Sequence, residues 1–252
     1  MILAIIQARM GSTRLPGKVL KPLLGKPMLA HQISRIKKCT KIDKLVIATS
    51  NLEQDNDIYK LAQSFNIPCY RGSQDNVLKR FYEASLVYSP THIVRLTADC
   101  PVIDAKLIDD VIALHLSENN DYTANCEENK YTFPDGLDVE IFSFQALLSS
   151  YKNATNKSDL EHVTPYIIEH SDIFKLGILH QEENWSYMRL TVDNIEDFQL
   201  IEHIYKALYE KNNDFDRFDI KEFLDSHPEL IKLNQNYKIN YAFHTDQNKI
   251  KP

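Results

Sequence analysis

Short apolar runs alternate with amphipathic stretches along the first part of the chain. Four runs have the length and composition of buried strands, and they cover residues 2–6, 44–49, 67–70 and 92–97. Stretches with apolar residues at helical spacing follow the first three runs, beginning near Lys26, after Asn51 and at Val77, the last reaching Tyr88. This alternation predicts an α/β fold with a parallel sheet and helices on both of its faces.

The second half of the chain has a less regular pattern. Three further segments are strand-like, at residues 121–124, 137–142 and 185–193. Three further helices are predicted, at residues 158–170, at 195–209 and around Phe223-Leu224. Pro165 must lie at a kink of the first of these helices or in its first turn, because proline lacks the N–H that a helix interior needs.

The end of the chain differs in composition from the rest. From Asn234 onward the sequence is polar and rich in lysine, and it has no apolar periodicity. No internal repeat or low-complexity linker divides the preceding residues. We therefore predict a single domain over residues 1–235 and a polar tail over 236–252, with the last ten residues disordered.

Composition and charge exclude several classes of protein. The 252 residues carry a net charge of −6, which argues against binding nucleic acid through a broad basic surface. The four cysteines are scattered without a C-x-x-C pair, which favours reduced thiols over a disulfide framework or a zinc site. No apolar run approaches the length of a membrane span, and the first residues lack the pattern of a signal peptide. We expect a soluble cytoplasmic protein.

The loop that follows the first predicted strand, residues 7–18, is strongly cationic. It carries Arg9, Arg14 and Lys18 around Gly11 and Gly17 and has no acidic residue. Glycine lets the backbone approach a ligand closely and cations neutralise charge, so the loop is a candidate phosphate site. The alternative is a solvated basic turn. The spacing of a P-loop is not satisfied.

The parallel sheet brings this loop close to two others. In such sheets ligands bind beyond the carboxyl ends of the strands. By that rule residues 7–18, 71–75 and 98–104 converge on one crevice, whatever motif each loop carries.

Two acids, Asp99 and Asp193, each follow a predicted strand of the same sheet. Two carboxylates in a crevice with a cationic loop would suit Mg²⁺, which takes one or two carboxylates together with substrate phosphates and water. The alternative is that each acid caps the following turn or helix. His162 is a candidate base or substrate ligand, against the more usual packed or capping role. The histidines show no metal-binding spacing, and the chain has no nucleophile elbow.

Six ordered motifs give the sequence a specific resemblance. The first loop, Gln7-Ala8-Arg9 with Ser12-Thr13-Arg14-Leu15-Pro16-Gly17-Lys18, resembles the N-terminal signature of the CMP-sugar synthetases, the acylneuraminate and 3-deoxy-manno-octulosonate cytidylyltransferases, and is nearest to the latter. The other five motifs are similar to those of the spore-coat polysaccharide biosynthesis protein F subfamily. They are residues 71–78, 95–101, 135–140, 161–166 and 189–193.

The resemblance implies a three-layer α/β/α fold of the nucleotide-diphospho-sugar transferase type, which is Rossmann-like, with a mixed and mainly parallel sheet, and usually a homodimer. It also implies a role for each matched residue. The triphosphate would contact Ala8, Arg9, Gly11, Ser12, Arg14 and Lys18. Arg71 and Asp75 would lie near the nucleoside, and Asp99 and Asp193 would bind Mg²⁺. One departure concerns Ala98-Asp99-Cys100, where sugar-activating enzymes usually carry glycine, aspartate and glutamate, and it leaves the acceptor open.

On this basis we predict a cytidylyltransferase that moves CMP from CTP to an acidic or related sugar and releases pyrophosphate, for surface polysaccharide or glycan synthesis. The catalytic residues would be Arg9, Lys18, Asp99 and Asp193. Positioning and charge neutralisation suffice for such chemistry, and no covalent nucleophile is needed. The sugar or a dimer partner would contact Asp138, Glu140 and His162. Two alternatives remain, a glycosyltransferase that uses a nucleotide-sugar donor and a catalytically silent nucleotide-binding protein.

Overall fold

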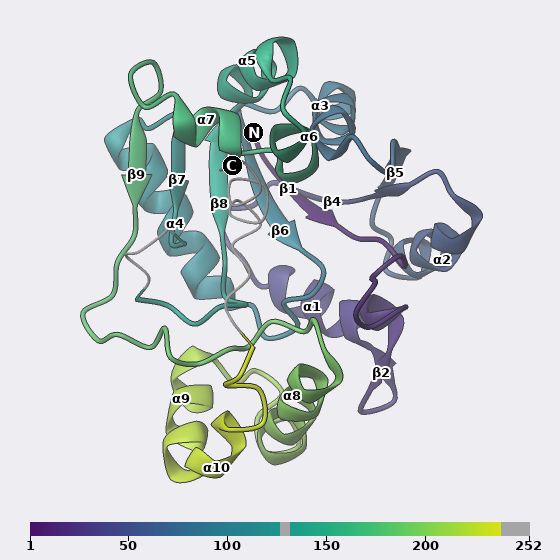
Figure 1. Cartoon of the computed structure of the whole chain (residues 1–252), viewed down its shortest axis with the longest axis vertical. Coiled ribbons are helices and arrows are strands. Elements are labelled where there is room, and N and C mark those ends of the chain that lie inside the picture. The colour runs from purple at the N-terminus through teal and green to yellow at the C-terminus, as the bar shows by residue number, and fades with distance from the viewer. Residues whose placement is uncertain (127–131, 238–252) are drawn as a thin grey trace, which may run out of the picture.

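A central sheet of seven strands runs through the protein, and the computed structural model describes residues 1–126 and 132–237. The strands are Ile2–Gln7 (β1), Lys44–Ser50 (β4), Cys69–Gly72 (β5), His92–Thr97 (β6), Tyr122–Ala124 (β7), Glu140–Ser143 (β8) and Leu176–Ile178 (β9). Their spatial order is β5-β4-β1-β6-β8-β7-β9 (Figure 1). β8 is antiparallel to both of its neighbours, and the other neighbouring pairs in this sheet are parallel.

The first strand shows why the sheet needs helices on both faces. Leu3 and Ile5 of β1 pack into one hydrophobic core, whereas Ala4 and Ile6 pack into the other, and all four are fully buried. Successive side chains of a strand point to opposite faces, so a strand that is apolar at every position must be covered on both sides.

Helices form the two outer layers (Figure 1). One face of the sheet is covered by α1 (Met28–Ile36), α2 (Asn56–Ser64) and α4 (Ala105–Glu118). α8 (Ile195–Leu208) joins the same core beyond the ends of the strands (Figure 1), where its Tyr205 contacts His31 of α1. The opposite face is covered by α3 (Val77–Tyr88), α5 (Phe144–Asn153) and α7 (Pro165–Glu169). The remaining elements are η1 (Lys18–Leu20), β2 (Pro22–Leu23), β3 (Lys26–Pro27), η2 (Glu53–Asp55), α6 (Lys157–His162), α9 (Arg217–Ser226) and α10 (Pro228–Ile231). The predicted three-layer fold with a mixed, mainly parallel sheet is confirmed.

The strand predicted over residues 185–193 is wrong. Its alternation arises because Met188, Leu190 and Val192 are buried in the core. The segment nevertheless forms only an isolated bridge, between Asp135 and Arg189. The alternation of apolar and polar residues reports which side chains enter the hydrophobic core. A strand also requires a neighbouring strand that completes a ladder of hydrogen bonds.

The strand predicted over residues 137–142 begins later, at Glu140. The side chain of Asn125 bonds the backbone before it: its Nδ2 donates to the Leu137 carbonyl at 2.9 Å, and its Oδ1 accepts from Val139 N at 2.8 Å. A side chain thus replaces the partner strand at these positions. The helix predicted over 158–170 is two helices, α6 and α7, with Pro165 in the first turn of α7. Neither α4, α5 nor β9 was among the predicted elements.

The predicted polar tail falls almost wholly outside the described residues. Of residues 236–252, only the first two are described, so the expected disorder of the last ten also lies outside. Among the described residues, no helix is long and apolar enough to cross a membrane.

The direction in which the chain moves through the sheet changes at β1. From β1 the chain passes to β4 and β5 on one side, and it then returns to form β6 on the other side of β1. Ala98 N, after β6, donates to the Gln7 carbonyl at 3.1 Å, so the loops after β1 and β6 start side by side. Open α/β sheets bind ligands outside the carboxyl ends of the strands at such a point.

Candidate functional site

The loop after β1 is fastened to the neighbouring strand before it reaches the site. Asp55, which is fully buried, accepts a hydrogen bond from Met10 N at 2.8 Å, and its second oxygen accepts from Ser50 N at 3.2 Å and from the Ser50 hydroxyl. Gly17 has a φ of 69°, in the left-handed region that favours glycine, and its N–H donates to the Met10 carbonyl at 3.1 Å. The loop therefore turns back on itself, and η1 begins at Lys18.

The Lys18 ammonium group lies at the centre of the site. Its Nζ donates to Asp99 Oδ2 and to Asp193 Oδ1 at 2.9 Å each, and to the Val192 carbonyl at 2.7 Å. Burial alone would lower the pKa of Lys18, but the two carboxylates outweigh it and raise this pKa, so the amine stays protonated. Two acids from distant parts of the sequence therefore meet at one cation, although Asp193 does not follow a strand as predicted.

Asp193 is bound by three cations, two from the loop after β1 and one from its own segment. Besides the lysine, Arg14 Nη2 lies 2.8 Å from its Oδ1, and Arg189 Nη2 lies 2.7 Å from its Oδ2. The acid that bonds the backbone ahead of α8 is Asp197, whose Oδ2 accepts from Asp193 N at 2.9 Å. The alternative that Asp193 caps this helix is therefore wrong, because its carboxylate faces the cations of the site.

Asp99 is ionised at neutral pH. Burial alone would raise its pKa, but the Lys18 charge and hydrogen bonds from Thr97 and Lys18 bring the pKa of Asp99 down to about 2. The Cys100 thiol lies 3.6 Å from Asp99 Oδ1 and is itself buried. Cys100, where sugar-activating enzymes usually carry glutamate, thus contributes a neutral neighbour to the carboxylate.

Arg189 organises the acids on the far side of the site. Its buried guanidinium forms ion pairs with three carboxylates, those of Asp135, Asp193 and Asp197. Burial, opposed by Arg189 and reinforced by the neighbouring acids, raises the pKa of Asp135 to about 6. Burial and the Asp135 charge also raise the pKa of Asp138. The site thus gathers several acidic groups around few cations.

The donor set fits Mg²⁺. Asp99 and Asp193 each place one oxygen 2.9 Å from a single point, the position of Lys18 Nζ. Within residues 1–126 and 132–237, no group of three or more histidine, cysteine or acidic side chains is arranged to hold a metal ion. A hard cation held by two carboxylates and completed by substrate oxygens and water matches this arrangement. The role of the two acids as metal ligands stays a prediction.

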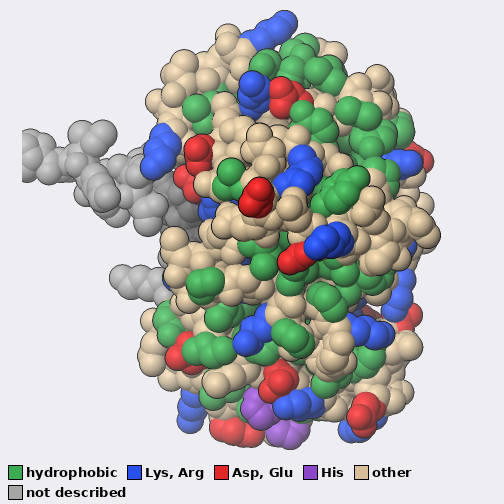
Figure 2. All heavy atoms as spheres, turned by 90° about the vertical axis from the view of Figure 1, so that its right-hand side faces the viewer, with side chains coloured by type: hydrophobic (Ala, Val, Ile, Leu, Met, Phe, Trp, Pro, Cys, Tyr) green, Lys and Arg blue, Asp and Glu red, His purple; other side chains and the backbone are tan. Residues whose placement is uncertain are grey.

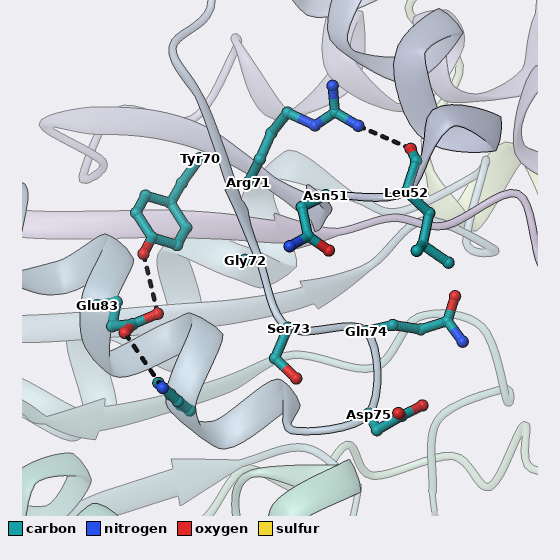
Figure 3. A pocket seen from close by; sticks show the side chains of 10 residues that line it. Asn51, Leu52, Tyr70, Arg71, Gly72, Ser73, Gln74, Asp75 and Glu83 are labelled. Atoms are coloured by element: carbon teal, nitrogen blue, oxygen red, sulfur yellow. Dashed lines mark hydrogen bonds and ion pairs between the residues drawn. The ribbon is translucent and has the colours of Figure 1, made fainter.

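A pocket of about 520 Å³ opens beside the end of β5 (Figure 3). Its lining residues come from the ends of β4 and β5, from the loop that follows β5 and from α3; they are Asn51, Leu52, Tyr70, Arg71, Gly72, Ser73, Gln74, Asp75, Lys79 and Glu83. The Arg71 guanidinium donates to the carbonyls of Ser50 and Leu52 and to the Asn56 side chain, so it shapes the wall of the pocket. Asp75 is exposed at the loop. The predicted placement of a nucleoside here stays a prediction.

The remaining predicted residues of the first loop lie along its path. Ala8 is buried, and its N–H extends the sheet by donating to the Ala48 carbonyl at 3.1 Å. Gly11 is exposed, and the half-buried Ser12 accepts from Leu15 N through its hydroxyl at 3.3 Å. These hydrogen bonds hold the backbone at Ala8 and Ser12, while Gly11 between them is open to solvent.

Arg9 lies at the opposite end of the loop, near α6. Its Nη2 is 3.9 Å from Glu161 Oε1, and both side chains are substantially exposed. His162 follows Glu161 at the end of α6. Glu140 is buried and accepts from Tyr122 Oη at 2.8 Å, from Thr164 Oγ1 at 2.7 Å and from Arg95. A sugar contact at Glu140 would therefore require one of these protein donors to leave.

Sequence reasoning missed three residues that build the site: Asp55, Asp135 and Arg189. Arg189 and Asp135 belong to matched motifs, and a signal existed at Arg189, a charge within a strand-like run of buried residues. Asp55 lies in an acidic cluster after Asn51, which predicted only the start of a helix. Its function depends on a contact with Met10 that no local pattern reveals.

The surface around one edge of the molecule carries mixed charge. On the face shown in Figure 2, lysine and arginine side chains are interspersed with acidic and hydrophobic ones and form no continuous basic stripe.

Comparisons with known proteins agree with this geometry. The sequence model of the family described as Cytidylyltransferase matches residues 3–221. The chain is 40% identical to an uncharacterized protein of Methanocaldococcus jannaschii, over 94% of this chain and 96% of that protein. It is 37% identical to the spore coat polysaccharide biosynthesis protein SpsF of Bacillus subtilis, over 83% of this chain and 87% of that protein. The solved structure of a cytidylyltransferase from Leptospira borgpetersenii superposes with a TM-score of 0.87 at 31% identity, and covers 95% of this chain and 99% of that one.

Proposed function

The chain belongs to the cytidylyltransferase family, and on that premise we propose that it transfers CMP from CTP to an oxygen of an acidic or related sugar, with release of pyrophosphate. The product would supply the synthesis of a surface polysaccharide or another glycan. The observation that carries the proposal is the convergence of Asp99 and Asp193 on Lys18, beside a cationic loop at the carboxyl ends of β1 and β6.

The reaction needs one bond to form and one to break. An acceptor oxygen bonds to the α-phosphorus of CTP, the bond from that phosphorus to the pyrophosphate oxygen breaks, and the acceptor gives up its proton to water or a carboxylate. Charge builds up on the departing pyrophosphate, where Arg9, Arg14 and Lys18 neutralise it. For this, Arg14 and Lys18 must exchange their carboxylate partners for phosphate oxygens.

The exchange explains why the acids and the cations occupy one site. Without nucleotide, Lys18 and Arg14 compensate the charge of Asp99 and Asp193. If phosphates draw these cations away, the two carboxylates would be free to hold Mg²⁺. The bound ion would screen phosphate charge and lower the pKa of an attacking hydroxyl.

The acceptor would lie next to the acids, near Asp138 and His162. Burial and the charge of Asp135 raise the pKa of Asp138 well above its usual range, which favours the protonated carboxyl. A neutral carboxylic acid donates a hydrogen bond to an anionic sugar, whereas an ionised aspartate would repel it. We propose this contact for Asp138.

We also propose that residues 1–235 act as one domain. The enzyme would be a homodimer.

A screen of pyrophosphate release tests the function. We expect release with CTP, Mg²⁺ and an acidic or related sugar, and little release with ATP, GTP or UTP. CTP should also raise the melting temperature most, since saturation at about 100 times Kd stabilises a protein by about 2.7 kcal/mol. Equal stabilisation by all four triphosphates would contradict a cytidine-specific site.

Two other outcomes of the screen would identify the alternatives. A glycosyltransferase would release a nucleoside diphosphate or CMP from a nucleotide-sugar and no pyrophosphate. A silent nucleotide-binding protein would be stabilised by CTP without turnover on any acceptor. A pyrophosphate signal that requires both CTP and one sugar class is the result that supports the proposal.

Arg14→Ala is expected to weaken CTP binding by about tenfold or more while the melting temperature changes little. The Arg14 side chain is 43% exposed, and after its removal Asp193 still has Lys18 and Arg189 as partners. A charge-assisted contact to phosphate contributes about 1.5–3 kcal/mol. Calorimetric titration with CTP measures the loss.

Lys18→Ala provides the comparison. It should weaken CTP binding at least as much and also lower the melting temperature, because two partly buried carboxylates lose their shared cation. If both variants bind CTP as the unmodified protein does, residues 7–18 are a surface turn and not a phosphate site.

A further inference from the structure

Arg80, on the buried side of α3, carries a charge that no carboxylate of the described residues neutralises. It is 2% exposed, and it lies on the helix with the buried Val77, Phe81 and Ala84. Its Nη1 donates to the Ser73 carbonyl at 2.7 Å, its Nε is buried without a hydrogen-bond partner, and no acid within residues 1–126 or 132–237 forms an ion pair with it. A buried charge without a counter-ion is costly.

The charged groups near Arg80 increase this cost. The side chain of Arg9 is close enough that, after burial itself, its charge is the main factor that lowers the pKa of Arg80, to about 10. Asp55 acts in the opposite direction, but both of its oxygens are already hydrogen-bonded, to Met10 and Ser50. Within the described residues Arg9 has Glu161 as an ion-pair partner at 3.9 Å, whereas the Arg80 guanidinium has no carboxylate partner.

Arg80 contacts the loop after β5, and the charge of Arg9 from the loop after β1 acts on it. It bonds the carbonyl of Ser73, which lines the pocket after β5. Its side chain also packs beneath Gly72, where a Cβ atom would lie 3.1 Å from Arg80 Cγ. Arg9 comes from the loop after β1, which carries the other cations of the site. The carbonyl of Ser73, in the loop drawn in Figure 3, is thus held by Arg80.

We propose that Arg80 is a binding residue for the phosphate chain of the nucleotide, and that Arg80 and Arg9 together form an anion subsite between the loop after β1 and the loop after β5. The inference rests on the proposed function, which it deepens. A phosphate supplies negative charge and several acceptor oxygens, and the planar guanidinium fork matches it. Cytosine supplies only neutral acceptors, which would bond to Arg80 but leave the repulsion from Arg9.

Substitution of Arg80 separates phosphate binding from a supporting role under the loop. Arg80→Gln and Arg80→Lys are titrated with CTP, with inorganic triphosphate and with cytidine. We expect Arg80→Gln to raise the Kd of CTP and of inorganic triphosphate about tenfold or more, and to leave the Kd of cytidine unchanged. Arg80→Lys, which keeps the charge, should lose less. Lys206→Gln, which removes an exposed cation paired with Glu202 on α8, is the charge-matched control.

Each outcome decides for or against the subsite. If Arg80→Gln and Arg80→Lys weaken cytidine, CTP and triphosphate equally, Arg80 only supports the loop and the inference is overturned. If inorganic triphosphate binds both variants as it binds the unmodified protein, it is overturned as well. An unmodified protein that binds no CTP would contradict the proposed function itself. Should Arg80→Gln fail to fold, a crystal structure of the unmodified protein with CTP decides: phosphate oxygens beyond about 4 Å from both guanidinium groups would exclude the subsite.

Discussion

Asp99→Asn is expected to lower turnover by at least about 100-fold while the protein keeps its fold. The substitution preserves shape but removes one of two carboxylates that converge on a single point. Removing one preorganised electrostatic group from a reaction of this kind costs about 10²–10³ in kcat. The Asp99 side chain is 26% exposed, so little core packing depends on it.

Binding measurements with and without metal make this prediction specific. In EDTA, Asp99→Asn should bind CTP as tightly as the unmodified protein or more tightly. Lys18 then has to break one ion pair fewer before it can contact the phosphates. With Mg²⁺ present, the variant should lose the gain in affinity that the ion provides. Turnover equal to that of the unmodified protein would mean that Asp99 serves only as an ion-pair partner of Lys18.

Asp193→Asn should lower turnover similarly but also lower stability. Asp193 is 8% exposed and contacts Lys18, Arg14 and Arg189, so its removal leaves buried cations undercompensated. Asp216→Asn is the matched control, since Asp216 caps α9 through its side chain and lies outside the site. It should leave turnover unchanged, because asparagine caps a helix as well as aspartate does.

Gly136→Ala is expected to destabilise the protein by at least about 3 kcal/mol. Gly136 has a φ of 102°, which alanine adopts only with strain. A Cβ atom here would also lie 2.8 Å from Thr191 Cα and nearer still to Thr191 N and the Leu190 carbonyl carbon. These are backbone atoms, and Leu190 N and Thr191 N donate to the Asp135 carbonyl at 2.6 and 3.0 Å, so neither segment is free to move away.

Gly25→Ala is the control for this substitution. Gly25 has a similar φ of 77°, but a Cβ atom at that position would meet nothing within 4 Å. It should cost only the backbone strain, about 1 kcal/mol. Urea denaturation of both variants measures the difference. Equal losses of unfolding free energy would show that residues 189–193 move away from the methyl group added at position 136. The acids bound by Arg189 would then not be held rigidly.

Burial patterns located most of the fold, whereas the roles that the family motifs assign to individual residues stay predictions. β1, β6 and α3 occupy the predicted residues within one position at either end. The burial of a strand on both faces, or of a helix on one face, produces a pattern of apolar residues that neighbouring positions of the sequence display. The prediction that the loops after β1 and β6 meet followed from the parallel sheet, since strand order alone brings their carboxyl ends to one edge.

The partners of the charged residues were decided by the tertiary structure alone. The residues 185–193 are strand-like in sequence, yet within residues 1–126 and 132–237 they pair with no strand, and they place Arg189 and Asp193. Asp193 precedes a helix and could have capped it, but its carboxylate faces Lys18 instead. Burial is a property of one residue and leaves a local pattern, whereas an ion pair depends on where a distant segment arrives. Arg80, which is buried and has no carboxylate partner among the described residues, can be recognised only once both loops are placed.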